Sequence, residues 1–179
     1  LCTANLPEPD ISPANGQEPA DYFNTVLWTA QSPYEDISIT GVGFKPDWLW
    51  IKSRSNADNH NLFDTTRGTG KFFRINADAE VTGSNNILSF DSDGFTTGTH
   101  TPINRSSGTH AAWCWKANGG TTSSNTDGTI TSTVQANTTA GFSIVSYTGN
   151  LTDGATVGHG LGDTPEVMIF KNRSDTQFA

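Results

Sequence analysis

Positive charge, cysteine and long apolar runs are all scarce in this sequence. Ten Lys and Arg stand against 18 Asp and Glu, a formal net charge of -8 with a pI of about 4.7, so the broad positive field that attracts a phosphate backbone is missing. Nucleic acid is therefore a poor partner. Apolar runs such as Trp48–Ile51 are far shorter than the roughly 20 residues that cross a bilayer. We expect no membrane insertion.

The two cysteines are too few and too far apart to form a site. Cys2 and Cys114 fit neither a metal-ligand spacing nor a disulfide-dense scaffold. Cys114 stands between Trp113 and Trp115, a position where a small soft thiol commonly fills space in a core. We therefore expect a buried thiol with no chemical role.

Small polar residues dominate what is present. Gly, Ser, Thr and Asn make up 75 of the 179 residues, and only 16% of the chain is charged. This composition favours strands and turns over helices. Five Trp and ten Phe supply large buried areas from few positions. The fold class we expect is all-β, an antiparallel β-sandwich of jelly-roll or lectin-like type.

The sequence contains one pattern twice, at a constant offset of 119 positions. Residues 23–29 match residues 142–148, and the offset continues without a gap through the block Gly41–Ser55, which recurs as Gly160–Ser174. The matched positions keep two glycines, a proline, a lysine, an arginine and a serine in the same order. We interpret this as one structural unit written once in full and once in part.

The repeat sets the domain boundaries that we expect. Residues 1–20 carry four of the eight prolines and form an extended arm. The first repeat occupies residues 21–117, a flexible Gly/Ser/Thr linker residues 118–128, and the partial second repeat residues 129–179. Because the chain opens without Met and the second copy stops early, we expect a piece of something longer, or a sheet that neighbouring subunits complete.

Short apolar or alternating runs between turn residues predict the strands. In the first repeat they are Tyr22–Thr29, Ile37–Thr40, Asp47–Arg54, Asn61–Asp64, Lys71–Asn76, Ile87–Phe90, Gly94–Thr97 and His110–Lys116. In the second they are Thr129–Gln135, Phe142–Thr148, Ala155–Gly158 and Glu166–Asn172. Trp48 and Trp50 alternate with Leu49 and Ile51, so both faces of that strand are apolar and it should be central.

Asp91 and Asp93 are the only paired carboxylates that suggest chemistry. They precede Gly94 and could open a calcium loop, but the twelfth position of such a loop is Pro102 instead of a bidentate Glu. An acid and base pair for polysaccharide cleavage is a further alternative. Asp-Gly pairs between apolar residues are the usual hairpin device, and we expect that role. We expect no catalytic residue and no cofactor.

Aromatic rings beside polar groups suggest a second kind of site. Rings exposed on a surface stack on sugars, and loops on a rigid sheet often carry recognition residues. Trp28 with Asn56, Asn59 and His60 are the glycan-binding candidates. The other four tryptophans form pairs at i, i+2, Trp48 with Trp50 and Trp113 with Trp115, and we expect them in the core.

Several motifs in a fixed order resemble a known kind of protein. They are the arm at residues 2–9, Gly41–Asp47 with Lys52–Ser55, Ser89–Phe95, Ala112–Lys116, and Val157–Gly162 with Lys171–Ser174. This series resembles a β-rich repeat domain of tail-fibre-like and other virion structural proteins of bacteriophages, especially marine ones. The resemblance implies a jelly-roll or lectin-like sandwich with a structural or host-attachment role, located on the virion. It implies no catalytic residue.

Three functions follow as alternatives. The first is a non-enzymatic virion component, a tail-fibre or surface decoration protein that forms a homo-oligomer and contacts other virion proteins. The second is a lectin-like module for a host surface glycan. The third is a polysaccharide depolymerase.

Overall fold

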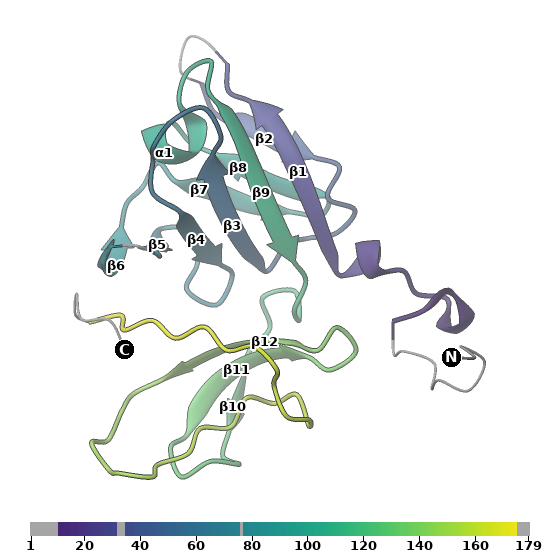
Figure 1. The fold of residues 1–179 in the computed structure, drawn as a ribbon, viewed down its shortest axis with the longest axis vertical. Coiled ribbons are helices and arrows are strands. Elements are labelled where there is room, and N and C mark those ends of the chain that lie inside the picture. Colours follow the sequence, from purple (N-terminus) through teal and green to yellow (C-terminus); the bar gives the residue numbers. More distant parts are fainter. Residues whose placement is uncertain (1–10, 32–34, 76, 175–179) are drawn as a thin grey trace, which may run out of the picture.

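The computed structural model describes residues 11–31, 35–75 and 77–174, and the fold is an antiparallel β-sandwich followed by a smaller sheet (Figure 1). The proposed arm residues 1–10, with Cys2, lie outside the described part. Residues 13–15 and 19–21 form two short 3-10 turns, η2 (Pro13–Asn15) and η3 (Pro19–Asp21), each with a proline at its start. The described part of the arm, residues 11–20, is therefore less extended than expected.

Three antiparallel sheets hold the strands. The largest sheet has the order β1 (Phe23–Thr29), β9 (Thr109–Trp115), β3 (Trp48–Ser53), β4 (Asn61–Asp64), β5 (Lys71–Arg74), β6 (Ala77–Thr82). The second has the order β2 (Ile37–Thr40), β8 (Gly94–Thr97), β7 (Ile87–Asp91), and a short helix α1 (Thr101–Asn104) leads from β8 to β9. The third has the order β10 (Ser123–Asn125), β11 (Ser132–Asn137), β12 (Phe142–Tyr147).

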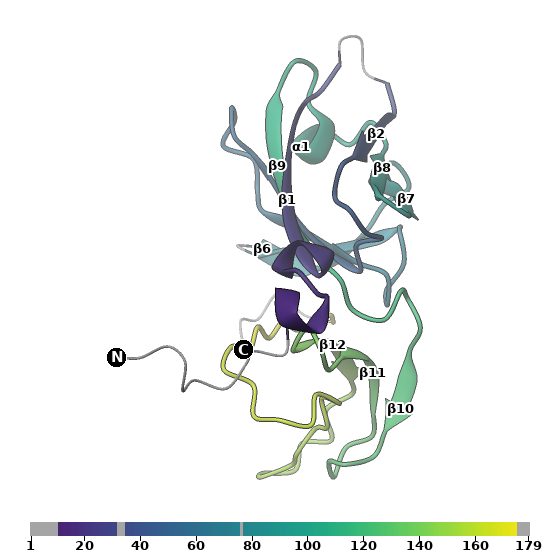
Figure 2. The same cartoon turned by 90° about the vertical axis from the view of Figure 1, so that its right-hand side faces the viewer.

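The main core lies between the first two sheets, which form the two layers seen in Figure 2. Alternation along each strand sends every second side chain inward. On β3 these are Leu49 and Ile51, which are fully buried and pack with Phe63, Phe95 and Cys114. The prediction of a central β3 is confirmed, because it pairs with β9 on one side and β4 on the other.

Cys114 is a free, fully buried thiol, as predicted. Burial raises the pKa of its thiol to about 12, since the core does not solvate a thiolate. The group is therefore protonated at neutral pH, which fits a residue that only fills space.

The paired tryptophans are not in the core. Trp48, Trp50, Trp113 and Trp115 are half-buried on the opposite face of the large sheet. The physical reason is the strand alternation itself: Leu49, Ile51, Ala112 and Cys114 take the inward positions. The expectation that these four rings build the core is wrong.

The segment between the repeats is partly ordered by a buried polar hub. The Asp47 carboxylate accepts hydrogen bonds from the backbone N–H groups of Ala117 and Gly119, at 2.8 and 2.9 Å, and from the Thr65 hydroxyl at 2.8 Å. Gln135, on β11, accepts from Gly120 N–H at 2.7 Å and donates to Thr65 at 2.9 Å. Because these side chains fix residues 117–120, and residues 123–125 form β10, the expectation of a flexible linker over residues 118–128 is corrected.

The two Gly-x-Gly loops adopt the same backbone. Gly41 and Gly43 have φ of 86° and 88°, and Gly160 and Gly162 have φ of 73° and 79°, left-handed values that glycine adopts without a steric penalty. The chain bends at residues 42–44 and 47, and again at 160–163 and 166. The Gly-x-Gly loop therefore has similar glycine φ values and similar bends in the two copies.

On both sides of this loop the two copies differ. Residues 48–53 are a strand, whereas the predicted strand at Glu166–Asn172 has no strand partner among the described residues. The predicted strand at Ala155–Gly158 is reduced to one bridge between Val157 and Ile130. Both expectations are corrected, and one reason explains both. The counterparts of these two segments in the first repeat are β3, which pairs with β9, and β2, which pairs with β8. Both partners come later in the unit than the part that is repeated.

In the described part of the chain, no helix has the length and apolar character needed to cross a bilayer.

Candidate interaction surface

Trp28, the aromatic glycan candidate, points into the sandwich. Its ring stacks on His110 at 5.3 Å and meets Phe95 edge-on at 5.8 Å between ring centroids. The ring packs against the main core, and His110 covers one of its faces. Trp28 therefore lies apart from the other three candidates.

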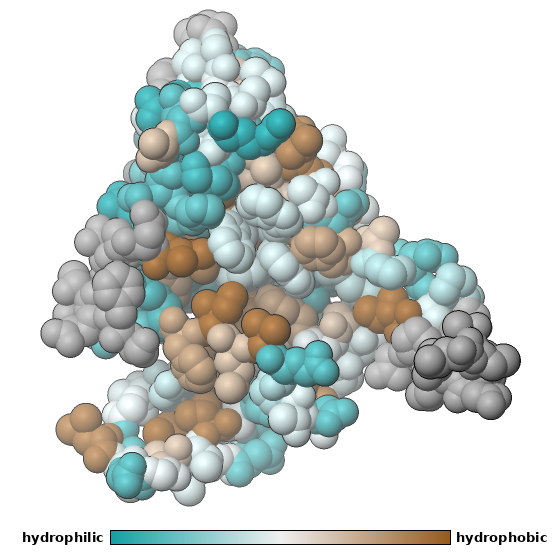
Figure 3. Space-filling view, viewed as in Figure 1, coloured by the Kyte–Doolittle hydropathy of each residue, from teal (hydrophilic) through white to brown (hydrophobic). Residues whose placement is uncertain are grey.

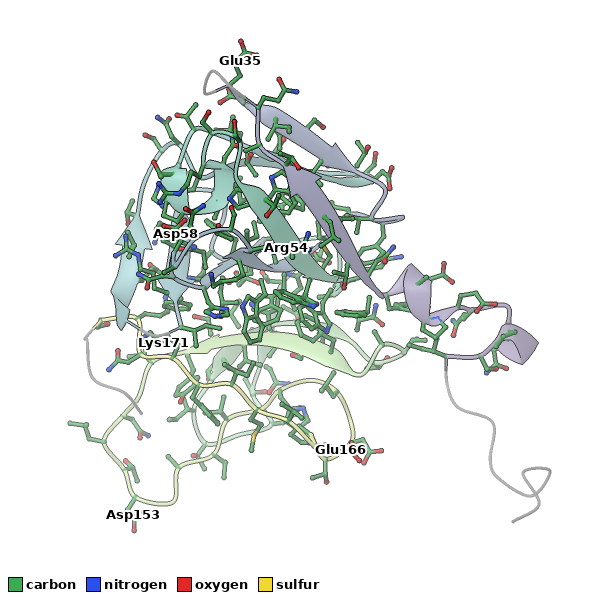
Figure 4. The ribbon with its side chains drawn as sticks, turned by 45° about the horizontal axis from the view of Figure 1, so that its top comes forward. Glu35, Arg54, Asp58, Asp153, Glu166 and Lys171 are labelled. Atoms are coloured by element: carbon green, nitrogen blue, oxygen red, sulfur yellow. The ribbon has the colours of Figure 1, made fainter. Side chains whose placement is uncertain are left out.

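Asn56, Asn59 and His60 do lie together, in the loop between β3 and β4 that also carries Arg54 and Asp58 (Figure 4). The Lys52 ammonium group stabilises this loop by donating hydrogen bonds to the backbone carbonyl groups of Ser53 and Asn56, at 2.6 and 3.0 Å. His60 Nδ1 accepts from the indole N–H of Trp50 at 2.9 Å. The loop is thus attached to the aromatic face of the sheet.

The imidazole of His60 is held in its neutral form. Its pKa is lowered, first by burial and then by the positive charge of Lys52. A neutral ring suits the acceptor role toward Trp50, because protonated histidine has no free lone pair. The arrangement offers hydrogen-bonding groups beside a half-buried indole.

Asp91 and Asp93 have separate structural partners. Asp93 accepts from the backbone N–H groups of Gly43 and Gly41, at 2.6 and 3.1 Å, and these bonds lower its pKa. Asp91 accepts from the Thr96 hydroxyl at 2.8 Å. The two carboxylates hold a loop and a hairpin, and no group of metal-ligating side chains occurs in the residues that the structure describes.

The outer face of the large sheet carries a ladder of aromatic rings. Trp48 contacts Trp50 at 6.2 Å and Trp115 at 4.6 Å between centroids. Phe142, the first residue of β12, packs on Trp48 and Trp115 at 5.9 and 6.1 Å. Phe142 brings the third sheet against Trp48 and Trp115, so these two tryptophans contact the second repeat. Sequence reasoning missed this role because the pairs at i, i+2 are equally compatible with either face.

The most exposed apolar segment is residues 167–170, which we call the open strand. Val167, Met168, Ile169 and Phe170 are 81, 65, 60 and 59% exposed. Leu49 and Ile51, the counterparts of Met168 and Phe170, are 0% exposed. Figure 3 shows hydrophobic side chains gathered between the sandwich and the third sheet, where this segment runs. Figure 4 places Glu166 and Lys171 at its two ends. Four consecutive exposed apolar residues are the signature of an interaction surface.

An ion pair secures the C-terminal end of the open strand. Arg173 donates to both carboxylate oxygens of Glu80, on β6, at 2.9 and 3.2 Å, and to the Ser146 hydroxyl of β12 at 3.0 Å. Burial raises the pKa of Glu80, but the opposing effects of Arg173, Arg67 and Lys71 outweigh it and the net pKa is lowered. The open strand is therefore held between two sheets at its end while its apolar part faces solvent.

Comparison with known proteins places the chain in one family. No curated protein matches it, and no solved structure matches it. A family model described as a domain of unknown function, DUF7483, matches residues 18–178, which include both repeats and the segment that joins them. The chain belongs to the DUF7483 family.

Proposed function

We propose that this protein is a non-enzymatic structural component of a bacteriophage virion, a tail-fibre-like or surface decoration protein that assembles with copies of itself and with other virion proteins. One observation carries the proposal: a complete sandwich is followed by a second copy of the same unit whose apolar strand is exposed. A modular scaffold that assembles through its strands has this form.

The contacts of the acidic residues support a structural role over a catalytic one. Asp93 is bound to two backbone N–H groups and Asp91 to a hydroxyl. A general acid of a glycosidase needs a raised pKa, and the pKa of Asp93 is lowered instead. The polysaccharide depolymerase alternative therefore has little support.

Two measurements test the proposal. Particles from a culture that produces the protein, purified on a density gradient, should contain its peptides by mass spectrometry. Recovery only from the soluble fraction would contradict a virion component. Light scattering over a concentration series should show assembly, and a monomer at all concentrations would contradict the assembly claim.

A glycan-binding module is the second candidate, favoured by the Trp50–His60 pair and the adjacent Asn56 and Asn59. Glycan-array binding by the intact protein that is lost in His60→Ala would favour it. Trp28→Ala is a poor test, because the ring packs against the core and its loss would also destabilise the fold.

A further inference from the structure

The outer face of the large sheet changes in character along β3. The alternation of the strand gives this face two aromatic rings followed by two cations, in the order Trp48, Trp50, Lys52 and Arg54. The backbone N–H of Arg54 donates to the Thr109 carbonyl at 2.7 Å. This bond continues the register of β3 and β9 by one residue and keeps Arg54 on the face of Lys52. The face is therefore aromatic at one end and cationic at the other.

The middle of this face offers rings to solvent. Trp50 and Trp113 are cross-strand neighbours, are half-buried, and lie 5.9 Å apart between ring centroids. The indole N–H of Trp113 has no hydrogen bond to any described residue. Leu27 of β1, on the same face, is 61% exposed, and Figure 3 shows hydrophobic and hydrophilic side chains side by side over this part of the sheet. Flat apolar groups with a polar edge suit the faces of sugar rings.

Polar groups of the loop between β3 and β4 stand at the edge of these rings. Because His60 Nδ1 accepts from the Trp50 indole, the neutral imidazole carries its proton on Nε2, from which it can donate to a ligand hydroxyl. The side-chain amide of Asn56 donates to the Ser55 hydroxyl at 2.9 Å, and its carbonyl oxygen can accept. Donors and acceptors beside an aromatic surface are what recognition of hydroxyl groups requires.

The charge of this face is opposite to that of the whole chain. The outward side chains of β1, β9 and β3 include no carboxylate, although the chain has a net charge of -8. Asp58, in the adjacent loop, is neutralised by Arg105 at 2.7 Å. Lys52 donates to uncharged carbonyl groups and keeps its charge. Arg54 is exposed, and its guanidinium forms no ion pair with the residues that the structure describes.

We propose that this face, defined by Leu27, Trp50, Lys52, Arg54 and Trp113, binds an acidic polysaccharide. Sugar rings lie against the two indoles, and a sugar carboxylate pairs with the Arg54 guanidinium, whose planar fork matches a carboxylate. The inference rests on the second candidate function, the glycan-binding module, and names its ligand class. A nucleic acid fits less well, because the negative charge of the rest of the chain repels a polymer with a phosphate at every nucleotide.

A glycan array that pairs each acidic glycan with its carboxyl-reduced form tests the ligand class. The acidic members should contain uronic or sialic acids, and single-stranded DNA should be printed beside them. We expect the intact protein to bind acidic glycans, with binding about tenfold weaker after carboxyl reduction. Equal binding of the acidic and reduced forms would overturn the proposal, as would binding to DNA that matches or exceeds binding to the glycans.

Two matched arginine variants test the role of Arg54. Arg54→Gln should weaken binding to the acidic glycan about fivefold, the effect of one exposed ion pair, and should leave binding to the reduced glycan unchanged. Arg173→Gln removes the same charge at the same position of the second repeat and should bind as the wild type does. Equal losses in the two variants would show an effect of net charge alone and would overturn the proposal.

A second matched pair tests the face without disturbing the core. Leu27, Ala111 and Lys52 occupy one row across β1, β9 and β3, so Leu27→Asp introduces a negative charge beside Lys52. This variant should weaken binding to the acidic glycan about tenfold, through repulsion of like charges. Leu151→Asp makes the same change at another exposed leucine and should have no effect. Thermal melting verifies folding, and unchanged binding in a folded Leu27→Asp would overturn the proposal.

Failure of this inference and failure of the proposed functions are distinguishable. Binding to neutral glycans that is lost in His60→Ala retains the glycan-binding module and removes only the acidic ligand. Binding to no glycan removes both. The virion role is decided separately, by the presence of the protein in purified particles.

Discussion

The two repeats share a sequence pattern and a loop geometry but differ in what surrounds them. In the first, the strand after the Gly-x-Gly loop lies between β9 and β4 and its inward side chains are fully buried. In the second, the same positions are extended and exposed. The Gly-x-Gly loop is therefore determined by its own residues. The strand that follows it forms only where strands distant in sequence pair with it.

The largest effect should come from truncating the same position in the two copies. Leu49→Ala removes a fully buried side chain and should lower the free energy of unfolding by about 2–5 kcal/mol. Met168→Ala, at the matching exposed position, should change it by less than about 0.5 kcal/mol. Urea unfolding measures both. Similar losses for the two variants would contradict the described difference in burial.

A second pair of variants compares the residues after the repeated prolines. Asp47→Ala leaves the N–H groups of Ala117 and Gly119 without their acceptor. The buried Ala117 donor should cost about 1–3 kcal/mol, and the exposed Gly119 donor less, because water can replace the carboxylate. The matched control is Glu166→Ala, which alters an exposed side chain and should be nearly neutral. Chemical denaturation followed by tryptophan fluorescence would reveal the difference. A neutral Asp47→Ala would show that the hub does not hold the two repeats together.

Acidification should destabilise the first repeat through its buried histidine. Burial lowers the pKa of His110, so the folded state keeps a neutral ring where the unfolded chain takes up a proton. Stability is then greatest above the ordinary histidine pKa of about 6.5, and it falls as the pH drops below that value.

One such histidine contributes at most about 1.4 kcal/mol per pH unit. The charged groups that act on His110 are Asp58, Arg105 and Lys52. His110→Phe should flatten the decline. Thermal melts between pH 7 and pH 5 check this. An identical slope in the wild type and His110→Phe would contradict the account.

The smallest effect should come from the ion pair that holds the open strand. Arg173 is 41% exposed, and pairs of this kind contribute about 0–1 kcal/mol. Arg173→Ala should therefore leave global stability almost unchanged while it increases proteolysis after residue 166. Arg54→Ala, the same position in the first repeat, should not change that cleavage. Unaltered protease sensitivity in Arg173→Ala would show that Glu80 does not anchor the segment.

The sequence predicted the strands of the first repeat well because their signals are local. Alternation identified β3 as central, and the turn at Asp93-Gly94 identified a hairpin. β10, Ser-Ser-Asn, was missed because it has no apolar residue. β6 was missed although Ala77, Ala79 and Val81 alternate with polar residues, because Ala, Asp and Glu are depleted in strands. The predicted strands at Ala155–Gly158 and Glu166–Asn172 fit the pattern, but a strand also needs a neighbour to pair with, and pattern alone does not provide one.

The candidate site residues also divide into those that a local sequence pattern predicts and those that only the fold brings together. Asn56, Asn59 and His60 are adjacent in sequence and were grouped correctly, whereas Trp28 belongs to the core because its strand alternation points it inward. The hub of Asp47, Thr65 and Gln135 joins residues that are up to 88 positions apart, from Asp47 to Gln135. No local pattern connects them.

Hydrogen exchange measured on the dilute, monomeric protein tests the central claim most directly: β3 is paired within a sheet, whereas its counterpart in the second repeat is not. The amides of residues 48–53 should exchange slowly, as those of a central strand do, while the amides of residues 167–171 should exchange at nearly the rate of an unstructured chain. Comparable slow exchange in both segments would show that the second copy is already closed, and would contradict the account.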